Sequence, residues 1–171
     1  MVVKQVTDGV VWMNGRNLVG QADEVKLPEI GMKMVNHAGL GSVGELELPS
    51  KLEKLQLDIK WKSFFGDVFR NAFNPFVPCV FQIRSSISGW DSINGVSKEI
   101  PLVTHITATC KKFALGELKS GDPASYPTEW AVQSLKQIED GKDVIEIDLM
   151  ANIFKVDGKP VRPQFNANLG I

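Results

Sequence analysis

The chain has 171 residues and a formal net charge of −1, a size that favours one domain over residues 1–171. A charge this close to zero excludes a global basic field that would hold nucleic acid through counterion release. Val and Ile together outnumber Ala more than threefold, and β-branched side chains fit a pleated sheet better than a helix, so we predict a mainly β fold.

The beginning of the chain lacks the apolar stretch of a secretory signal. The longest run without charged residues, 71–83, contains two prolines, whereas a membrane-spanning helix needs about 20 apolar residues. We therefore expect no insertion into a membrane, and synthesis and folding in a cytoplasm.

Residues 39–44 form a glycine-rich segment. Gly39, Gly41 and Gly44 match the GxGxxG pattern of dinucleotide sites, which requires a strand before it and a helix after it. The alternating residues 45–48 and then Pro49 come next, which predicts a strand that stops at the proline. We expect a turned loop here and no nucleotide site.

Alternation of apolar and polar residues predicts half-buried strands in the middle of the chain. In 54–62, Leu55, Leu57, Ile59 and Trp61 share one face. Further strands are predicted in 77–84, 102–113 and 143–149, with Val77 and Leu149 on their apolar faces.

Only one segment has a strong helical pattern. An apolar stripe at helical spacing predicts a short helix over 64–73, ended by Asn74-Pro75. The segment 119–127 contains two prolines and is predicted to be a loop. Four dipeptides suit the positive-φ positions of tight hairpin turns and favour antiparallel pairing: Asn14-Gly15, Asn94-Gly95, Asp140-Gly141 and Asp157-Gly158.

Few residues in the chain are of types that commonly bind metals or catalyse reactions. Cys79, Cys110, His37 and His105 lack the spacing of a zinc site or of a disulfide framework, so we expect buried free thiols and no metal. The four tryptophans could form a stacking platform, but two occupy apolar strand positions, which favours core packing.

Two carboxylates share one face of the predicted 143–149 strand. Glycosidases use a pair of carboxylates at a separation close to that of Glu146 and Asp148. Adjacent acids on one face also occur on many solvated or subunit-contacting strands. We therefore favour a surface or interface role over acid/base catalysis.

The order of turn and loop residues resembles one family. Asn14-Gly15, Gly20, Leu27-Pro28, Lys33 and the glycine loop look like the opening of major tail tube proteins of contractile-tailed bacteriophages. The end of the chain resembles the C-terminal block of that family in order and spacing, through Asp140-Gly141, Glu146-Ile147-Asp148, Asn152-Ile153, Val156-Asp157-Gly158 and Asn168-Leu169-Gly170-Ile171.

The resemblance implies an antiparallel β-sandwich or partial barrel with one short flanking helix, similar to the tubes of R-type bacteriocins and type VI secretion. It implies a structural protein, not an enzyme, without catalytic residues or cofactors. Six copies would close into a ring, and stacked rings would form a hollow tube that conducts DNA into the host after sheath contraction.

The resemblance also implies partners and a place. The partners would be further copies of the chain, the tail sheath protein, the baseplate and tail-terminator proteins, the tape measure protein, and DNA in transit without sequence-specific binding. The place would be the virion tail, made and assembled in the cytoplasm of the bacterial host.

Two segments are expected to contact neighbouring subunits: a projecting hairpin at about 26–48, which is hard to bury within its own domain, and a C-terminal arm at about 160–171. The candidate interface residues are Met32, Met34, His37, Gly39, Gly41, Gly44, Phe165, Leu169 and Ile171. A conduit for DNA should be neutral or acidic, so Glu146 and Asp148 are candidates for the lumen face.

Two other functions remain open at this point. The chain could be a small β-barrel binding module whose aromatic side chains line a cavity for an apolar or carbohydrate ligand. It could also be a hydrolase that uses Glu146 and Asp148.

Overall fold

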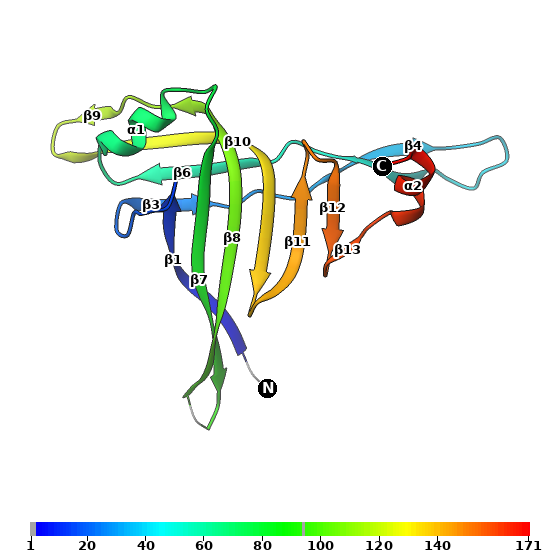
Figure 1. The fold of residues 1–171 in the computed structure, drawn as a ribbon, viewed down its shortest axis with the longest axis horizontal. Coiled ribbons are helices and arrows are strands. Elements are labelled where there is room, and N and C mark those ends of the chain that lie inside the picture. The colour runs from blue at the N-terminus through cyan, green and yellow to red at the C-terminus, as the bar shows by residue number, and fades with distance from the viewer. Residues whose placement is uncertain (1–2, 94) are drawn as a thin grey trace.

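The computed structural model describes residues 3–93 and 95–171. These residues form a large antiparallel sheet, a separate two-stranded ribbon and two short helices (Figure 1). In chain order the elements are β1 (Val3–Met13), β2 (Arg16–Asn17), β3 (Ala22–Lys26), β4 (Met32–His37), β5 (Leu46–Leu52), β6 (Gln56–Trp61), α1 (Gly66–Ala72), β7 (Cys79–Asp91), β8 (Gly95–Phe113), β9 (Glu117–Lys119), β10 (Asp122–Glu139), β11 (Lys142–Asp148), β12 (Ile153–Val156), β13 (Lys159–Pro160) and α2 (Pro163–Leu169).

The large sheet has the order β13-β12-β11-β10-β8-β7-β1-β2, and β6 joins it through β10. Every recorded strand pair is antiparallel, and the described sheet does not close into a barrel. The prediction of a mainly β, sandwich-like fold is confirmed.

Strand β10 belongs to two layers at once. Its first half pairs with β6, with Trp130 opposite Leu57, and its second half pairs with β11, with Lys136 opposite Glu146. Along both halves its other edge pairs with β8. Figure 1 shows β3 and β6 running across β1, β7 and β8, so the two layers enclose a core between them.

The core is built around large aromatic side chains. Trp61, Trp130, Phe69 and Phe81 are essentially inaccessible to solvent, and the Phe81 and Trp130 rings meet edge to face with centroids 4.7 Å apart. Helix α1 closes the end of this core with three buried residues, Val68, Phe69 and Ala72.

A single buried hydroxyl ties β6 to β10. Thr128 Oγ1 accepts hydrogen bonds from Trp61 Nε1 at 3.1 Å and Trp130 Nε1 at 2.9 Å, and it donates to the Ile59 carbonyl at 2.9 Å. Both indole N–H groups lie in the dry core, where an unpaired donor is costly. We call this group the Thr128 junction.

Several local predictions are confirmed. The alternation in 54–62 forms β6, with Leu55, Leu57, Ile59 and Trp61 all buried. The helical stripe in 64–73 forms α1. The turn dipeptides Asn14-Gly15, Asp140-Gly141 and Asp157-Gly158 have positive φ at both positions, as two-residue hairpin turns of this type require. Gly95 also has positive φ, while Asn94 lies outside the described residues.

Two proline-based predictions are wrong. Strand β5 continues through Pro49 instead of stopping there, because the ribbon has free edges and a register shift beside Met34 accommodates a residue without an N–H. The segment predicted as a loop at 119–127 is a hairpin, in which β9 turns at Gly121 into β10. Pro123 falls where the pairing of β10 with β9 is irregular, and the Pro127 carbonyl accepts a hydrogen bond from the Ala114 N–H at 3.1 Å.

The ends of two predicted strands also differ from expectation. Val77 lies before β7 and Leu149 lies after β11, and both side chains are exposed instead of sharing the apolar faces of those strands. The helix α2, which no pattern in the sequence predicts, occupies most of the expected C-terminal arm.

The folded chain exposes far more surface than its mass requires. Its accessible area is 11618 Å², whereas a compact monomer of this mass exposes roughly 8,300 Å². Exposed large hydrophobic side chains account for part of the difference, among them Leu40, Val43, Phe76 and Leu118. An excess of this size is typical of a chain whose surface is covered by other subunits.

We predict that Thr128→Val lowers the free energy of unfolding by about 3 kcal/mol, because two buried indole donors lose their acceptor. Thr128→Ser is the matched control, since it keeps the hydroxyl and costs about 1 kcal/mol for the lost methyl group. Urea denaturation followed by tryptophan fluorescence measures both. A Val variant as stable as the Ser variant would contradict the role of the Thr128 junction.

Both cysteines are buried free thiols, as predicted. Burial raises the pKa of Cys79, and it raises the pKa of Cys110 to about 11 despite a backbone hydrogen bond from Lys112 that acts in the opposite direction. We predict that neither thiol reacts with an aromatic disulfide reagent near pH 8 until urea unfolds the chain.

The same pKa difference has a consequence for stability. The unfolded chain loses its thiol protons at about pH 8.5, before the folded chain does, so stability should fall as the pH rises from there towards 11. Replacement of Cys110 by Ala should reduce this fall. Rapid labelling of one thiol in the native protein would show that the thiol is accessible, contrary to the structure.

Candidate functional site

The large sheet has one face packed on the core and one face turned away from it, which we call the polar face. Strict alternation separates them: on β7, Phe81 and Ile83 are buried while Gln82 is half-buried and Arg84 exposed. On β10 and β11, Leu135 and Ile147 are buried while Lys136 and Glu146 are half-buried. The polar face therefore carries mostly polar and charged side chains, with Trp12 and the exposed Val80 among them.

Directly opposed residues form a row across six strands of the polar face. Lys136 on β10 stands opposite Glu146 on one side and opposite His105 on the other. From β12 to β1 the row reads Lys155, Glu146, Lys136, His105, Gln82 and Trp12. Lysine and glutamate alternate at its β12 end, which is a favourable cross-strand arrangement.

Lys136 is the best-paired cation of this face. Its Nζ lies 3.0 Å from Asp143 Oδ2 and 4.0 Å from Glu146 Oε2. The hydrogen bond to Asp143 raises the pKa of Lys136 above its ordinary value. The lysine therefore remains charged and bound to carboxylates of the neighbouring strand.

Glu146 and Asp148 both lie on the polar face, separated by the buried Ile147, as the alternation in the sequence predicts. They border a shallow, open depression of about 120 Å³ together with Lys136 and His105. Glu146 faces Lys136, and Asp148 Oδ1 accepts hydrogen bonds from the Met150 and Ala151 N–H groups, both at 2.9 Å. Each carboxylate thus has a structural partner.

Both ends of the sheet are almost uncovered. At one end β2 pairs with β1 only at Trp12 and Met13, so within the described residues 3–9 pair with β7 alone. At the other end β13 pairs with β12 only at Lys155 and Val156. Free strand edges of this kind offer backbone N–H and C=O groups to another chain.

Strands β4 and β5 form a ribbon apart from the large sheet, and Figure 1 shows it on the same side of the molecule as α2. We call the ribbon and α2 together the arm. Its two parts meet at a shallow depression of about 170 Å³ that is lined by Leu52, Val161 and Phe165 among others. The helix α2 has no buried residue.

The arm contains the residues that the sequence proposes as subunit contacts. Met32 is half-buried. The others are exposed: Met34, His37, Gly39, Gly41, Gly44, Phe165, Leu169 and Ile171. An isolated two-stranded ribbon is marginally stable in water, so the arm depends on packing against something else.

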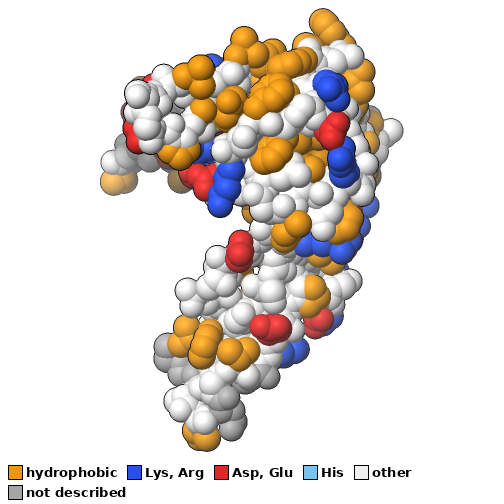
Figure 2. Space-filling view, turned by 90° about the vertical axis from the view of Figure 1, so that its left-hand side faces the viewer, with side chains coloured by type: hydrophobic (Ala, Val, Ile, Leu, Met, Phe, Trp, Pro, Cys, Tyr) orange, Lys and Arg blue, Asp and Glu red, His pale blue; other side chains and the backbone are white. Residues whose placement is uncertain are grey.

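A second apolar surface was missed from the sequence. It surrounds α1 and β9 and contains Phe64, Phe73, Phe76, Leu115 and Leu118, all exposed. Figure 2, which looks onto the side of the molecule where α1 and β9 lie, shows hydrophobic side chains gathered over its upper part. The high density of phenylalanines between 64 and 76 could have indicated this surface, but the spacing of these residues predicts only the apolar stripe of a helix.

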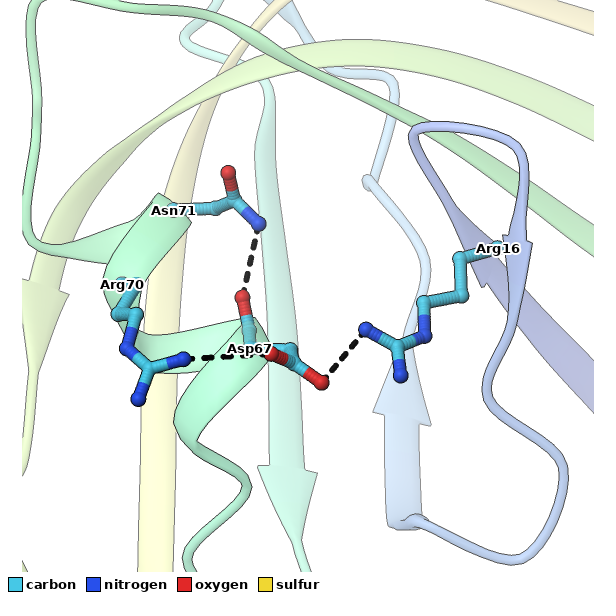
Figure 3. A network of polar contacts seen from close by, with 4 residues as sticks. All are labelled: Arg16, Asp67, Arg70 and Asn71. Carbon is cyan, nitrogen blue, oxygen red and sulfur yellow. Dashed lines mark hydrogen bonds and ion pairs between the residues drawn. The ribbon is translucent and has the colours of Figure 1, made fainter.

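An exposed polar network fixes α1 beside the β1–β2 turn (Figure 3). Asp67 at the start of the helix binds Arg16 on β2 at 2.5 Å and Arg70 at 3.4 Å, and its carbonyl accepts a hydrogen bond from Asn71 Nδ2 at 2.8 Å. Exposed ion pairs contribute about 0–1 kcal/mol each, so this network orients α1 more than it stabilises the fold.

The part of the chain that the structure describes contains neither a metal-binding group of side chains nor a membrane-spanning helix. Among the described residues, no three His, Cys, Asp or Glu side chains are grouped in a way that could hold a metal ion. Both described helices have seven residues, which is too short to cross a bilayer.

Comparison with known proteins gives a consistent result. A family model described as phage tail tube protein FII matches residues 4–170. The tail tube protein of Escherichia phage P2 is 25% identical over 167 residues, which cover 94% of each chain.

Solved structures share the fold at low sequence identity. A chain in the structure of the sheath/tube terminator of an extracellular contractile injection system, PVC, in the extended state has a TM-score of 0.57 at 10% identity, covering 76% of this chain and 92% of that chain. A chain of the PVC sheath–tube complex in the extended state has a TM-score of 0.55 at 11% identity, covering 76% and 87%.

Proposed function

Since the chain belongs to the phage tail tube protein FII family, and so is a structural subunit of a tail tube, we propose that six copies close into a ring and that rings stack into a hollow tube. The tube conducts DNA into a bacterial host once a surrounding sheath contracts.

The observation that carries this proposal is the pair of nearly free edges at opposite ends of one sheet. Residues 3–9 of β1 lack an outer partner strand in the described part of the chain, and β12 is covered only by the two-residue strand β13 and the Val161 N–H that follows it. Joining β1 of one copy to the β12–β13 edge of the next pairs both edges in a head-to-tail contact. Repetition of that contact around an axis gives a closed ring without exposed edges.

The arm supports contacts beyond the strand edges. Many of its apolar side chains are exposed, among them Val35, Leu48 and Leu169, and the exposed area of the chain exceeds that of a compact monomer by about 3,300 Å². We assign the arm, including the 26–48 segment and the 160–171 segment, to contacts with neighbouring subunits. The apolar surface around α1 and β9 is a further area for burial in the assembly.

We place the polar face on the lumen side, with Glu146 and Asp148 on the wall. The opposite face of the sheet packs on the core, so this is the face left for a passage. Its mixture of lysines and carboxylates lacks a continuous row of free cations, which suits DNA that must slide past without being held.

The proposed partners follow from the position in a tail. They are the sheath, baseplate, terminator and tape measure proteins, with DNA as a passenger that is not read by sequence. The two PVC chains of similar fold come from structures of a sheath/tube terminator and of a sheath–tube complex, which supports sheath and terminator contacts. Within a virion tail, we expect assembly in the host cytoplasm before lysis.

Two rival functions receive less support from the geometry. A binding module would need its aromatic side chains around a cavity, but Trp61, Trp130, Phe69 and Phe81 fill the core. A hydrolase would need Glu146 and Asp148 free for chemistry, whereas one faces Lys136 and the other accepts two backbone hydrogen bonds of a turn.

We predict that the purified chain forms rings or hollow tubes of uniform width as its concentration rises. Electron microscopy over a concentration series, with analytical ultracentrifugation of the same samples, measures this. Compact monomers at every concentration, even after addition of preformed tail tips as nuclei, would contradict the proposal and favour the binding module.

We predict that a chain ending at Arg162 folds but does not assemble. The helix α2 buries no residue, so its removal should leave the melting temperature within about 2 °C of that of the full chain, whereas tubes should be absent. Lys60→Ala, a change at an exposed position of β6 that lies outside the arm and the strand edges, is a control for assembly. Normal tubes from the truncated chain would show that α2 is not a contact.

A further inference from the structure

The Lys136 side chain combines a structural task with an electrostatic one. The pairing of β10 with β11 shifts register between Gln137 and Ile138, beside the hairpin turn. Asp143 and Glu146 lie on the two sides of this shift, and Lys136 reaches both. One cation thereby ties the irregular part of the hairpin together and is itself neutralised.

Other cations stand near Lys136 on the same face. Lys155 is directly opposite Glu146 on β12, and His105 is directly opposite Lys136 on β8. Arg84 lies over the Trp12 ring with its Cζ 5.1 Å from the ring centroid, which orients the guanidinium without cancelling its charge. Three fixed cations and a histidine on one face would form a phosphate-binding surface if no carboxylates accompanied them.

We propose that Asp143 and Glu146 keep the polar face from binding the phosphate backbone of DNA by holding Lys136 between them. Removing both carboxylates converts the face into one that binds duplex DNA. This inference rests on the proposed function, since it takes the polar face as the wall of the passage, but the masking of Lys136 is a property of the single chain.

The energetics favour a measurable effect. A cation with a carboxylate oxygen at 3.0 Å must give up that contact to bind a phosphate, so it adds little to DNA affinity. Without the carboxylates, the gain comes from Lys136 itself and from the relief of repulsion between two acids and the polyanion. In a ring the same change repeats in every subunit, so the gain is larger in the assembled state.

The test is the double variant Asp143→Asn, Glu146→Gln, with fluorescence anisotropy of a short linear duplex at low salt. We expect the dissociation constant of the double variant to fall at least about tenfold relative to the unchanged chain, with affinity lost again as salt is raised. Adding Lys136→Gln to the double variant should leave only the gain from the relieved repulsion, which we expect to be less than about twofold, as in the control below.

A matched control separates masking from net charge. Glu117→Gln with Asp122→Asn changes the net charge by the same amount and frees Lys119, whose Nζ lies 3.2 Å from Glu117, on the β9–β10 hairpin away from the polar face. This control should gain less than about twofold. An equal gain in the control, or a full gain that survives Lys136→Gln, would overturn the inference.

The side chains of Asp143 and Glu146 are only about a third exposed, so the double variant could lose stability. Glu146→Gln alone removes the longer, 4.0 Å contact and should give a smaller gain of the same sign. No gain in either variant, in folded protein, overturns the inference.

Assembled tubes distinguish the inference from the proposed function. A closed circular duplex cannot enter a tube, whereas a short linear duplex can. Binding of only the linear duplex by double-variant tubes supports both the masking and the lumen position. Binding of both forms supports the masking but places the polar face outside, which contradicts the proposed lumen wall.

Discussion

The fold depends on the sharing of β10 between two layers, and the Thr128 junction holds that arrangement together. Thr128 lies on β10 opposite Ile59 of β6, and its hydroxyl binds an indole from each of these strands. Along its other edge β10 pairs with β8 of the layer that carries the polar face. Because β6 and β10 meet at a dry, fully paired hydroxyl, these two strands keep their relative position without any contribution from the arm or the strand edges.

How much of the fold could be predicted depends on whether a residue's partners are near it in the sequence or on a distant strand. Residues whose partners are local follow simple patterns: Leu57 and Ile59 alternate with polar residues, and Asp140-Gly141 makes a two-residue turn. Pro49 and Pro127 were misread because a proline is compatible with a strand wherever its missing N–H faces no partner. That depends on which neighbouring strand pairs with it, and sequence alone does not reveal the pairing.

The arrangement of the candidate site could likewise be predicted only in part. That Glu146 and Asp148 share a face follows from alternation within one strand. That Lys136 lies between Asp143 and Glu146 does not, because the register shift at Gln137 and Ile138 changes which residues oppose one another. The exposed surface around α1 was equally hidden, since Phe69 and Phe76 look alike in sequence although the first is fully buried and the second almost fully exposed.

A subunit that must assemble needs its contact surfaces to be separate from the interactions that fold it. Here the core closes with Trp61, Trp130 and α1 at one end, while the arm has almost no buried residue and the strand edges lie at the limits of the sheet. The contacts can therefore form and rearrange between copies while each subunit keeps its fold. The polar face is similar in one respect, because Lys136 is paired with Asp143 and Glu146 within the chain and needs no neighbouring subunit to neutralise it.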